Sequence, residues 1–426
     1  MRLAFLLTLL TCSAALQAQV IALKAARMFD GKGDAMRTPG LVVVEGGKIE
    51  SVGGNVPPGA TVIDLGDATL LPGFMDAHTH LTMDFNPDYV REEIDTLQRP
   101  IPEQALIASS YARKTLMAGF TTVRDVGSRD FLDIGLRNAI NHGIVDGPRM
   151  LVSVHAIGAT GGHCDDSAGF RFGLFGHETG VADGVINSPW EARDAVRFNI
   201  KYGADVIKTC ATGGVLSLTD DVDTPQLTQE ELDALVDEAH ALRRKTAAHA
   251  HGATGAKRAI KAGIDSIEHG TFLDDEGLRM MREHGTYLVP TLATRTGIAE
   301  MKLPPQVRAK ADLALKQQDN MVRRALANGV KIALGTDAAV YPHGNNAVEF
   351  VLMAADGMPL AQALRAGTSS AADLLGLSAK LGTLEAGKLA DVVAVPGNPL
   401  EDIKVTQSVF FVMKQGKVYR NDRVGK

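Results

Sequence analysis

Histidine, lysine and aspartate side chains recur where successive β-like segments end in the middle of this 426-residue chain. These residues are His78, His80, Lys208, His249, His269 and Asp337. Strands that bring such residues together must run in one direction, with helices or loops returning between them. This pattern constrains the fold more than any other feature of the chain.

The region from 72 to 380 alternates β-rich and helical segments, which predicts an α/β fold. The expected strands are 73–76, 121–124, 150–154, 206–208, 246–249, 266–268, 286–289 and 331–334. Helical patterns cover 229–245, 253–262 and 310–328. Eight strands with helical crossovers favour a (β/α)8 TIM barrel, whose strands end at one common mouth. A doubly wound sheet is the alternative, because periodicity does not show how a sheet closes.

Both ends of the chain carry additional β patterns. A hairpin-like pair spans 41–52 around Gly46-Gly47, and further β segments lie between 391 and 419. Neither set is large enough to fold alone, so we expect the two to join in one small β-sandwich domain. The predicted divisions are a signal peptide (1–18), the two sandwich parts (19–71 and 381–426) and the barrel (72–380).

The N-terminus has the pattern of a secretory signal peptide. Met1-Arg2 is followed by an apolar run from 3 to 10, and Leu16-Gln17-Ala18 is an acceptable cleavage site. We therefore expect an exported protein, periplasmic or secreted, with no membrane association after cleavage. A buried N-terminal helix is the alternative. The net charge is -6, and the sequence shows no stripe of basic residues. Both observations argue against nucleic acid as a partner.

The predicted mature chain holds two cysteines, Cys164 and Cys210. Two cysteines do not make a disulfide framework, so the core must supply the stability. We expect small buried thiols, although a nucleophilic role for either stays open.

The ligand types suit a pair of divalent cations, with Zn²⁺ expected. His78 and His80 are two residues apart, so both side chains leave an extended segment on the same face. His249 and His269 are one βα unit apart, and His251 is a competing ligand. Lys208 could be an ordinary strand-end lysine. If it reacts with carbon dioxide, however, the resulting carbamate is an anion able to bridge both cations.

These motifs together resemble the metal-dependent amidohydrolase superfamily. The resemblance rests on Gly73-Phe-Met-Asp-Ala-His78-Thr-His80, Gly203-Ala-Asp-Val-Ile-Lys208, Ala248-His-Ala-His251-Gly, Ile267-Glu-His269-Gly, Leu334-Gly-Thr-Asp337 and the segment 382–391. The lysine and Gly161-Gly-His163 are similar to the exported group of binuclear Xaa-Pro dipeptidases and ochratoxinases.

The resemblance implies an assignment for each site residue. His78, His80 and Asp337 would hold one metal, His249 and His269 the other, and Lys208 would bridge them as a carbamate. Asp337, His163 and His251 would be catalytic, with Asp337 passing a proton to the leaving amine. The substrate-binding residues would be His163, His251 and Arg295, of which Arg295 has the least support.

The resemblance also implies a reaction. A metal-bridging hydroxide would cleave the amide bond to a C-terminal amino acid in dipeptides, N-acyl amino acids or ochratoxin A. A homo-oligomer is expected, and an octamer is one such form. A mononuclear cyclic-imidate hydrolase or deaminase of the imidazolonepropionase-like branch is the alternative, and a periplasmic binding protein with a vestigial barrel is another. A serine hydrolase is disfavoured because no Gly-x-Ser-x-Gly motif is present.

Overall fold

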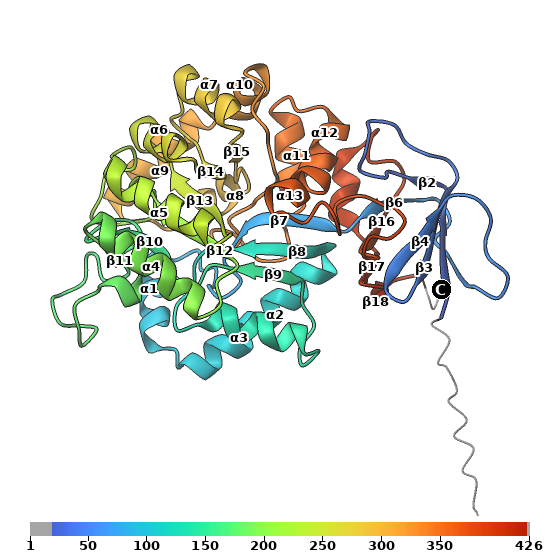
Figure 1. The fold of residues 1–426 in the computed structure, drawn as a ribbon, viewed down its shortest axis with the longest axis horizontal. Coiled ribbons are helices and arrows are strands. Elements are labelled where there is room, and N and C mark those ends of the chain that lie inside the picture. Colours follow the sequence, from blue (N-terminus) through green and yellow to red (C-terminus); the bar gives the residue numbers. More distant parts are fainter. Residues whose placement is uncertain (1–18, 424–426) are drawn as a thin grey trace, which may run out of the picture.

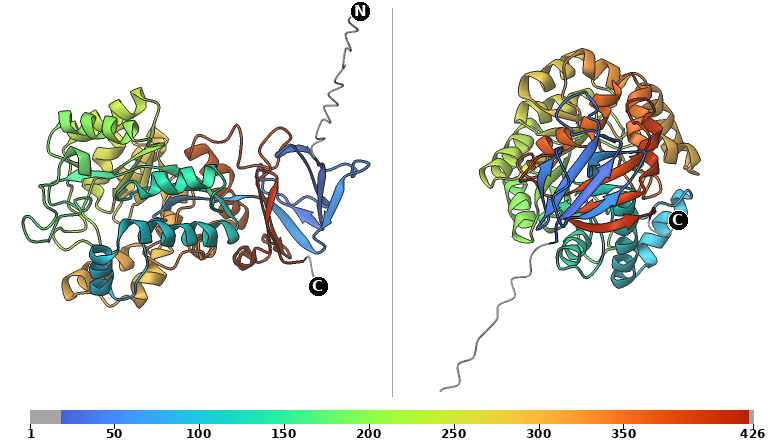
Figure 2. Two further views of the ribbon diagram at one scale, coloured as in Figure 1. Left: turned by 90° about the horizontal axis from the view of Figure 1, so that it is seen from below. Right: turned by 90° about the vertical axis from the view of Figure 1, so that its right-hand side faces the viewer.

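The computed structural model describes residues 19–423, so the predicted signal peptide lies outside the described residues. Two mixed sheets lie at one end of the molecule, and two parallel sheets with their helices form the rest (Figures 1 and 2). Within residues 19–423, no helix combines the length and apolar character needed to cross a membrane.

Strands from both ends of the chain share one mixed sheet, with the order β18-β17-β16-β6-β2. Its strands are β2 Arg27–Met28, β6 Ala68–Pro72, β16 Val392–Pro396, β17 Phe411–Lys414 and β18 Lys417–Asn421. Because β6 and β16 pair antiparallel, the N-terminal and C-terminal segments are joined by backbone hydrogen bonds. Figure 2 shows these blue and red strands side by side.

The second mixed sheet has the order β4-β3-β1-β5. Its strands are β1 Ile21–Ala25, β3 Gly40–Glu45, β4 Lys48–Val52 and β5 Thr61–Asp64. Leu23 and Val44 of this sheet share one buried apolar cluster with Leu70 and Phe411 of the other. The domain boundaries proposed at 71/72 and 380/381 stay predictions.

The parallel strands carry the candidate site. One sheet has the order β7-β8-β9 and the other β11-β10-β12-β13-β14-β15. Their bounds are β7 Phe74–Thr79, β8 Phe120–Asp125, β9 Arg149–Val152, β10 Ala156–Ala159, β11 Val185–Ile186, β12 Val206–Cys210, β13 Lys245–Ala250, β14 Ser266–His269 and β15 Tyr287–Val289. Every residue of β7, β12 and β14 is buried, as expected for parallel strands covered on both faces.

The predicted strand 331–334 is not a regular strand, and its pairing with β15 is a single bridge between Leu288 and Ile332. Leu288 N donates to Lys331 O (2.8 Å), and Ala77 N of β7 donates to Leu334 O (2.9 Å). The segment therefore runs between the two parallel sheets, although it forms no continuous ladder.

On the β7 side the ladder is interrupted because the carbonyl groups of residues 366 and 367 accept hydrogen bonds from both segments. Leu334 N donates to Ala366 O (2.9 Å), and Met75 N of β7 donates to Gly367 O (2.8 Å). The main chain at 366–367 thus occupies positions that a regular eighth strand would use.

The helices lie outside the parallel strands (Figure 1). They are α1 Tyr89–Gln98, α2 Ile101–Met117, α3 Leu132–Asn141, α4 Pro189–Lys201, α5 Gln229–Ala241, α6 Ala253–Ala262, α7 Asp275–His284, α8 Thr294–Glu300, α9 Pro305–Gln317, α10 Met321–Ala327, α11 Val348–Ala355, α12 Leu360–Ala366 and α13 Ser369–Leu374, with 3₁₀ helices η1 Val181–Asp183 and η2 Ile403–Ser408. The predicted helix 310–328 is wrong as one element, because Asn320 takes a left-handed conformation (φ 63°) between α9 and α10.

Candidate metal centre

The parallel strands bring the predicted site residues to one cavity. His78 is in β7 and His80 follows it, Lys208 is in β12, His249 is in β13, and His269 ends β14. Asp337 follows the segment 331–334. All six residues line a cavity of about 450 Å³. Strand ends that are far apart in sequence therefore build one site.

His78 and His80 each have one ring nitrogen fixed by a hydrogen-bond acceptor. Nδ1 of His78 lies 2.8 Å from Oε2 of Glu268, and Nδ1 of His80 lies 3.2 Å from Gly127 O. A carboxylate and a carbonyl oxygen only accept, so both Nδ1 atoms carry the proton. In each neutral ring, Nε2 then keeps its lone pair for a cation.

His269 is oriented in the same way. Its Nδ1 lies 2.8 Å from Oγ1 of Thr291, whose hydroxyl donates to Pro290 O at 2.8 Å. The Thr291 proton is therefore used, so Nδ1 of His269 is the donor and Nε2 keeps its lone pair.

The ring of His249 is hydrogen-bonded through Nε2, whereas the other three rings are hydrogen-bonded through Nδ1. Its Nε2 lies 3.1 Å from Gly213 O, which leaves Nδ1 as the nitrogen with the lone pair. Burial lowers the pKa of His249 well below its ordinary value, and nearby histidines add to this effect. A neutral ring is the form that binds a metal.

Asp337 supplies the carboxylate of the site. Its Oδ1 lies 3.5 Å from Nε2 of His78 and 3.3 Å from Nε2 of His80. Burial raises the pKa of Asp337, but His78, His80 and His269 outweigh burial and hold it far below its ordinary range. Asp337 and His269 both have positive φ (60° and 70°), an uncommon backbone conformation that is found at functional sites.

Lys208 is buried beside these groups. Burial lowers the pKa of its amine to about 8, the carboxylates of Glu268 and Asp337 oppose that shift, and the charge of Arg124 adds to it. At pH 7 a pKa of about 8 leaves roughly a tenth of the amine neutral, and the neutral amine is the form that reacts with carbon dioxide.

The donor set fits divalent cations. His78, His269 and Asp337 each place one ligand atom within 4.8 Å of the others, and so do His249, His251 and His269. Imidazole nitrogens and a carboxylate oxygen are the ligands that zinc and neighbouring metals take.

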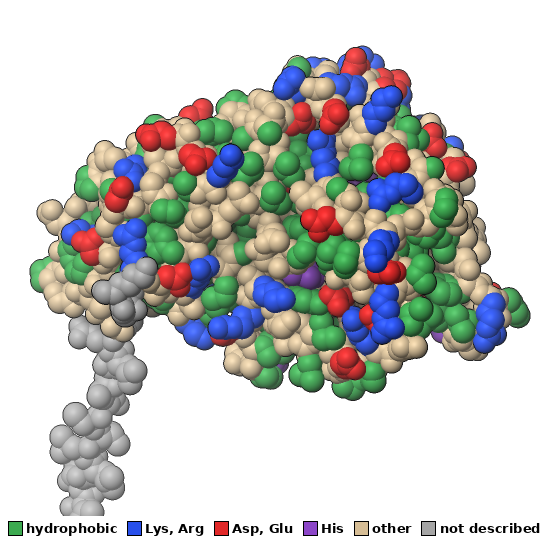
Figure 3. Space-filling model, turned by 180° about the vertical axis from the view of Figure 1, so that it is seen from behind, with side chains coloured by type: hydrophobic (Ala, Val, Ile, Leu, Met, Phe, Trp, Pro, Cys, Tyr) green, Lys and Arg blue, Asp and Glu red, His purple; other side chains and the backbone are tan. Residues whose placement is uncertain are grey.

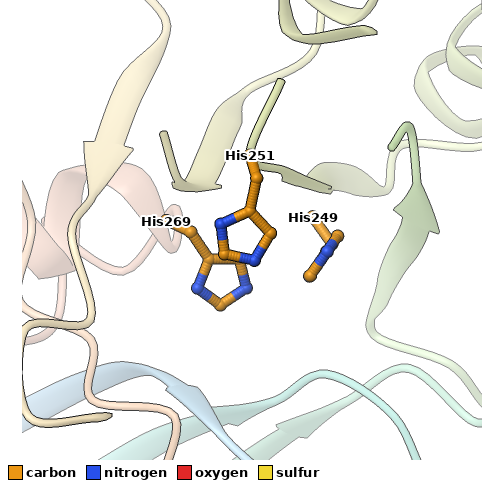
Figure 4. A group of neighbouring side chains, drawn as sticks. All are labelled: His249, His251 and His269. Atoms are coloured by element: carbon orange, nitrogen blue, oxygen red, sulfur yellow. The ribbon is translucent and has the colours of Figure 1, made fainter. Parts of the chain in front are cut away.

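His251 lies about as close to His269 as His249 does, with 4.7 and 4.6 Å between the ring centroids. Its ring stacks on His269 with 4.7 Å between ring centroids, and its Nδ1 lies 2.7 Å from Oγ1 of Thr271. Figure 4 shows the three rings pointing toward one space. His251 therefore reaches the same space as His249 and His269 and could act as a metal ligand there.

The remaining predicted substrate residues are placed differently from each other. His163 lines the cavity, and its ring lies 4.2 Å from that of His249, measured between centroids. Arg295 is not among the residues that line the cavity, and its guanidinium donates to Gln318 (3.1 Å) and Asp319 (3.2 Å). The structure therefore brings His163 to the site and leaves Arg295 outside it.

Cys164 and Cys210 form a disulfide, so the expectation of two buried thiols is wrong. Their Cα atoms are 5.9 Å apart although 46 positions separate them in the chain. Cys164 follows His163, and Cys210 comes two residues after Lys208. The bond therefore ties the turn that carries His163 to the strand that carries Lys208.

Two residues that surround His78 were missed from the sequence. Glu268 orients His78, and its Oε1 accepts from Nη2 of Arg124 at 2.8 Å, with both side chains buried. Glu268 precedes His269, so the motif Ile267-Glu-His269 was a signal that could have been followed. Arg124 gave a weaker signal, as a charged residue at the end of an apolar strand.

The charged side chains on one face of the molecule are of both signs. Acidic and basic side chains are interspersed on the face shown in Figure 3. The expectation that nucleic acid is not a partner stays a prediction.

Comparison with known families decides the assignment. The family model described as "Amidohydrolase family" matches residues 69–419. The chain belongs to the amidohydrolase family. The resemblance inferred from the motifs is thereby confirmed, and so is the enzyme class: this amidohydrolase is a hydrolase of amide bonds.

Individual proteins extend the comparison. Ochratoxinase of Aspergillus niger is 33% identical over 441 residues, covering 96% of this chain and 88% of that protein. The crystal structure of a Xaa-Pro dipeptidase with bound methionine aligns with a TM-score of 0.89 at 42% identity, covering 95% of this amidohydrolase and all (100%) of that chain. The crystal structure of the A. niger ochratoxinase aligns with a TM-score of 0.84 at 31% identity, covering 96% and 97% of the two chains.

Proposed function

We propose that this amidohydrolase uses two divalent cations, expected to be Zn²⁺, to hydrolyse the amide bond to a C-terminal amino acid. The observation that carries the proposal is the hydrogen bonding of four histidines. In each ring one nitrogen is tied to an acceptor, and the other is left for a ligand in the same cavity. Four rings that each keep an unprotonated nitrogen beside one cavity are expected at a metal site and are not required for packing alone.

In the proposed assignment, His78, His80 and Asp337 would hold one cation, and His249 and His269 would hold the other. Lys208 lies between the two groups as a carbamate. Its neutral amine nitrogen forms a bond to the carbon of carbon dioxide, and one C=O π pair moves to oxygen. The nitrogen, now positively charged, then loses one proton to solvent. The product is an anion that suits two neighbouring positive charges.

The cations would lower the pKa of water enough to make a nucleophile at neutral pH and would polarise the scissile carbonyl. Asp337, as a carboxylate, takes the proton of the attacking water and passes it to the leaving amine. His163 and His251 contact the substrate. Arg295 is not retained as the contact for the substrate carboxylate, because its guanidinium is held by Gln318 and Asp319.

The substrate classes follow from the relatives. One is named as a Xaa-Pro dipeptidase and another as an ochratoxinase, so we propose dipeptides, N-acyl amino acids and ochratoxin A as candidates. The cavity of about 450 Å³ is large enough for a substrate of that size.

We extend the proposal to the architecture and the location. The parallel strands, with 331–334 in the eighth position, would form a (β/α)8 barrel, and the two mixed sheets would form a β-sandwich. The Cys164–Cys210 disulfide supports export, because disulfides persist in oxidising compartments. A homo-oligomer remains part of the proposal.

The experiment compares chelator-treated enzyme with zinc-reconstituted enzyme on a panel of dipeptides, N-acyl amino acids and ochratoxin A. Turnover of at least one amide that is lost on chelation and restored by zinc is expected. Turnover only of cyclic imides or of aminated bases would instead support the alternative branch.

A further inference from the structure

The loop after β12 sets the position of the His163 ring. Nδ1 of His163 lies 3.1 Å from Oγ of Ser217, and its backbone N–H donates to Oε1 of Gln226 at 2.9 Å. Gly214 packs against the ring, since a Cβ built at this position would lie 2.2 Å from its Nδ1. Residues 213–226 therefore form a wall against which the ring is held.

The hydroxyl group of Ser217 donates its hydrogen bond to an acceptor other than His163. Its Oγ lies 2.6 Å from Oδ1 of Asp220 and 3.1 Å from Gly214 O. Burial raises the pKa of Asp220, but the Ser217 hydrogen bond and the charge and hydrogen bond of Lys310 act against burial, and the pKa is lowered. The carboxylate and the carbonyl oxygen both accept only, so the single Ser217 proton is used on one of them.

Ser217 Oγ must then accept a hydrogen bond from Nδ1–H of His163. In the neutral ring this leaves Nε2 without a proton. Because His163 lines the cavity, Nε2 is the ring nitrogen left to meet a substrate, and it meets it as a hydrogen-bond acceptor. This differs from the role of a histidine that donates to the scissile carbonyl oxygen.

Asp220 itself is held firmly. Nζ of Lys310, from α9, donates to Oδ1 of Asp220 (3.1 Å) and to the backbone oxygens of Gly214 (2.8 Å), Ser217 (2.6 Å) and Asp220 (2.9 Å). Gln226 Nε2 donates to Oδ2 of Asp220 at 2.8 Å. The carboxylate therefore has one orientation available for Ser217.

We infer that Asp220 is a positioning residue of this enzyme. Acting through Ser217, it fixes the orientation and the tautomer of His163, so that Nε2 accepts a hydrogen bond from an N–H or O–H group of the substrate. The inference rests on the proposed function for the statement that His163 meets a substrate. The tautomer itself does not depend on which substrate that is.

The test uses the zinc-loaded full chain with ¹⁵N-labelled histidine. The His163 resonances are assigned by their loss in His163→Gln. In the wild type we expect a protonated, pyrrole-type Nδ1 and an unprotonated, pyridine-type Nε2. In Asp220→Asn one of the two carboxylate oxygens becomes an amide NH₂, although Lys310 and Gln226 each donate to one of these oxygens. Ser217 thus loses its ionised acceptor, and part of the His163 proton population should move from Nδ1 to Nε2.

The same variant should lose roughly 10- to 100-fold in kcat/KM with zinc content unchanged. Its Tm should fall, because the largely buried Lys310 loses its ionised partner. Asp221→Asn is the matched control, because this exposed neighbour undergoes the same chemical change and should behave as the wild type. If Asp220→Asn fails to fold, Ser217→Ala removes the same link and should shift the nitrogen signals in the labelled protein.

Two results would overturn the inference. One is a proton on Nε2 of His163 in the wild type. The other is an Asp220→Asn protein whose nitrogen signals and kcat/KM both match the wild type. If the wild type hydrolyses no amide, the proposed function fails, and the nitrogen signals still decide the tautomer independently.

Discussion

Oε2 of Glu268 lies 2.8 Å from Nδ1 of His78, and both side chains are buried. Burial raises the pKa of Glu268, but the charge of Arg124 and the contact with His78 outweigh it and lower the pKa to about 2. A carboxylate that is always ionised accepts from His78 at every ordinary pH. It therefore fixes which nitrogen of His78 faces the cavity.

Glu268→Gln should weaken zinc binding about 10- to 100-fold, because the amide no longer fixes the ring and leaves the buried Arg124 without its anion. Zinc affinity is measured by competition with a chelator of known affinity, and Tm is recorded in parallel. Glu300→Gln on the exposed end of α8 is the control and should bind zinc normally. Unchanged affinity in the folded Glu268→Gln protein would contradict the role given to this carboxylate.

Asp337→Asn should abolish turnover while the chain keeps most of its metal. The amide oxygen can still act as a ligand, but it cannot take up and pass on a proton near neutral pH. Turnover and metal content are measured on the same preparation. Full activity in this variant would remove Asp337 from the proton transfer.

Replacing both Cys164 and Cys210 by serine should lower the free energy of unfolding by about 2–4 kcal/mol. The physical reason is that the closed loop of the unfolded chain, with its ends 46 positions apart, gains conformational freedom when the bond is lost. Denaturant unfolding with and without reductant measures the effect. A wild type that is equally stable in both conditions would show that the bond does not form in solution.

The ionised carboxylate of Asp265 should stabilise the folded protein at neutral pH and less so in acid. Burial raises its pKa, but the hydrogen bond from His240 and the contacts with Lys245 and Thr246 outweigh it and lower the pKa from 3.8 to about 2. A pKa that is lower in the folded state than in the unfolded state stabilises the protein above the unfolded pKa. That contribution is lost as the pH falls through the folded value.

Asp265→Asn should therefore lower the free energy of unfolding by about 2 kcal/mol at neutral pH, and the difference from wild type should shrink between pH 4 and 2. Unfolding by urea at several pH values measures it. Asp233→Asn, on the exposed face of α5, should show no such dependence. A pH-independent difference for Asp265→Asn would mean that packing and not ionisation is lost.

The position of the site could be predicted because ligand-type residues end parallel strands. His78, His249 and His269 lie on or at the end of short buried strands, and strands that run parallel bring their ends to one mouth. Their spacing along the chain was therefore enough to place them together. The choice between His249 and His251 could not be made in this way, because both rings reach the same space.

Other parts of the site depended on long-range contacts that leave no local pattern. Ser217, Asp220 and Lys310 come from an irregular loop and a distant helix, so no periodicity connects them to His163. Cys164 and Cys210 are close only because β10 and β12 pair as neighbours. Arg295 was the least supported substrate-binding candidate, and its guanidinium is held by Gln318 and Asp319 and is not part of the cavity lining.

The most direct test of the central claim is the metal content of the zinc- and bicarbonate-reconstituted enzyme, measured beside Lys208→Ala. With a carbamate on Lys208 to bridge the two ligand groups, the wild type should hold about two cations per chain and the variant about one, with turnover lost in the variant. A ¹³C carbamate signal should appear in the wild type alone after labelling with ¹³C-bicarbonate. About one cation per chain in both proteins, with equal turnover, would contradict the two-cation site.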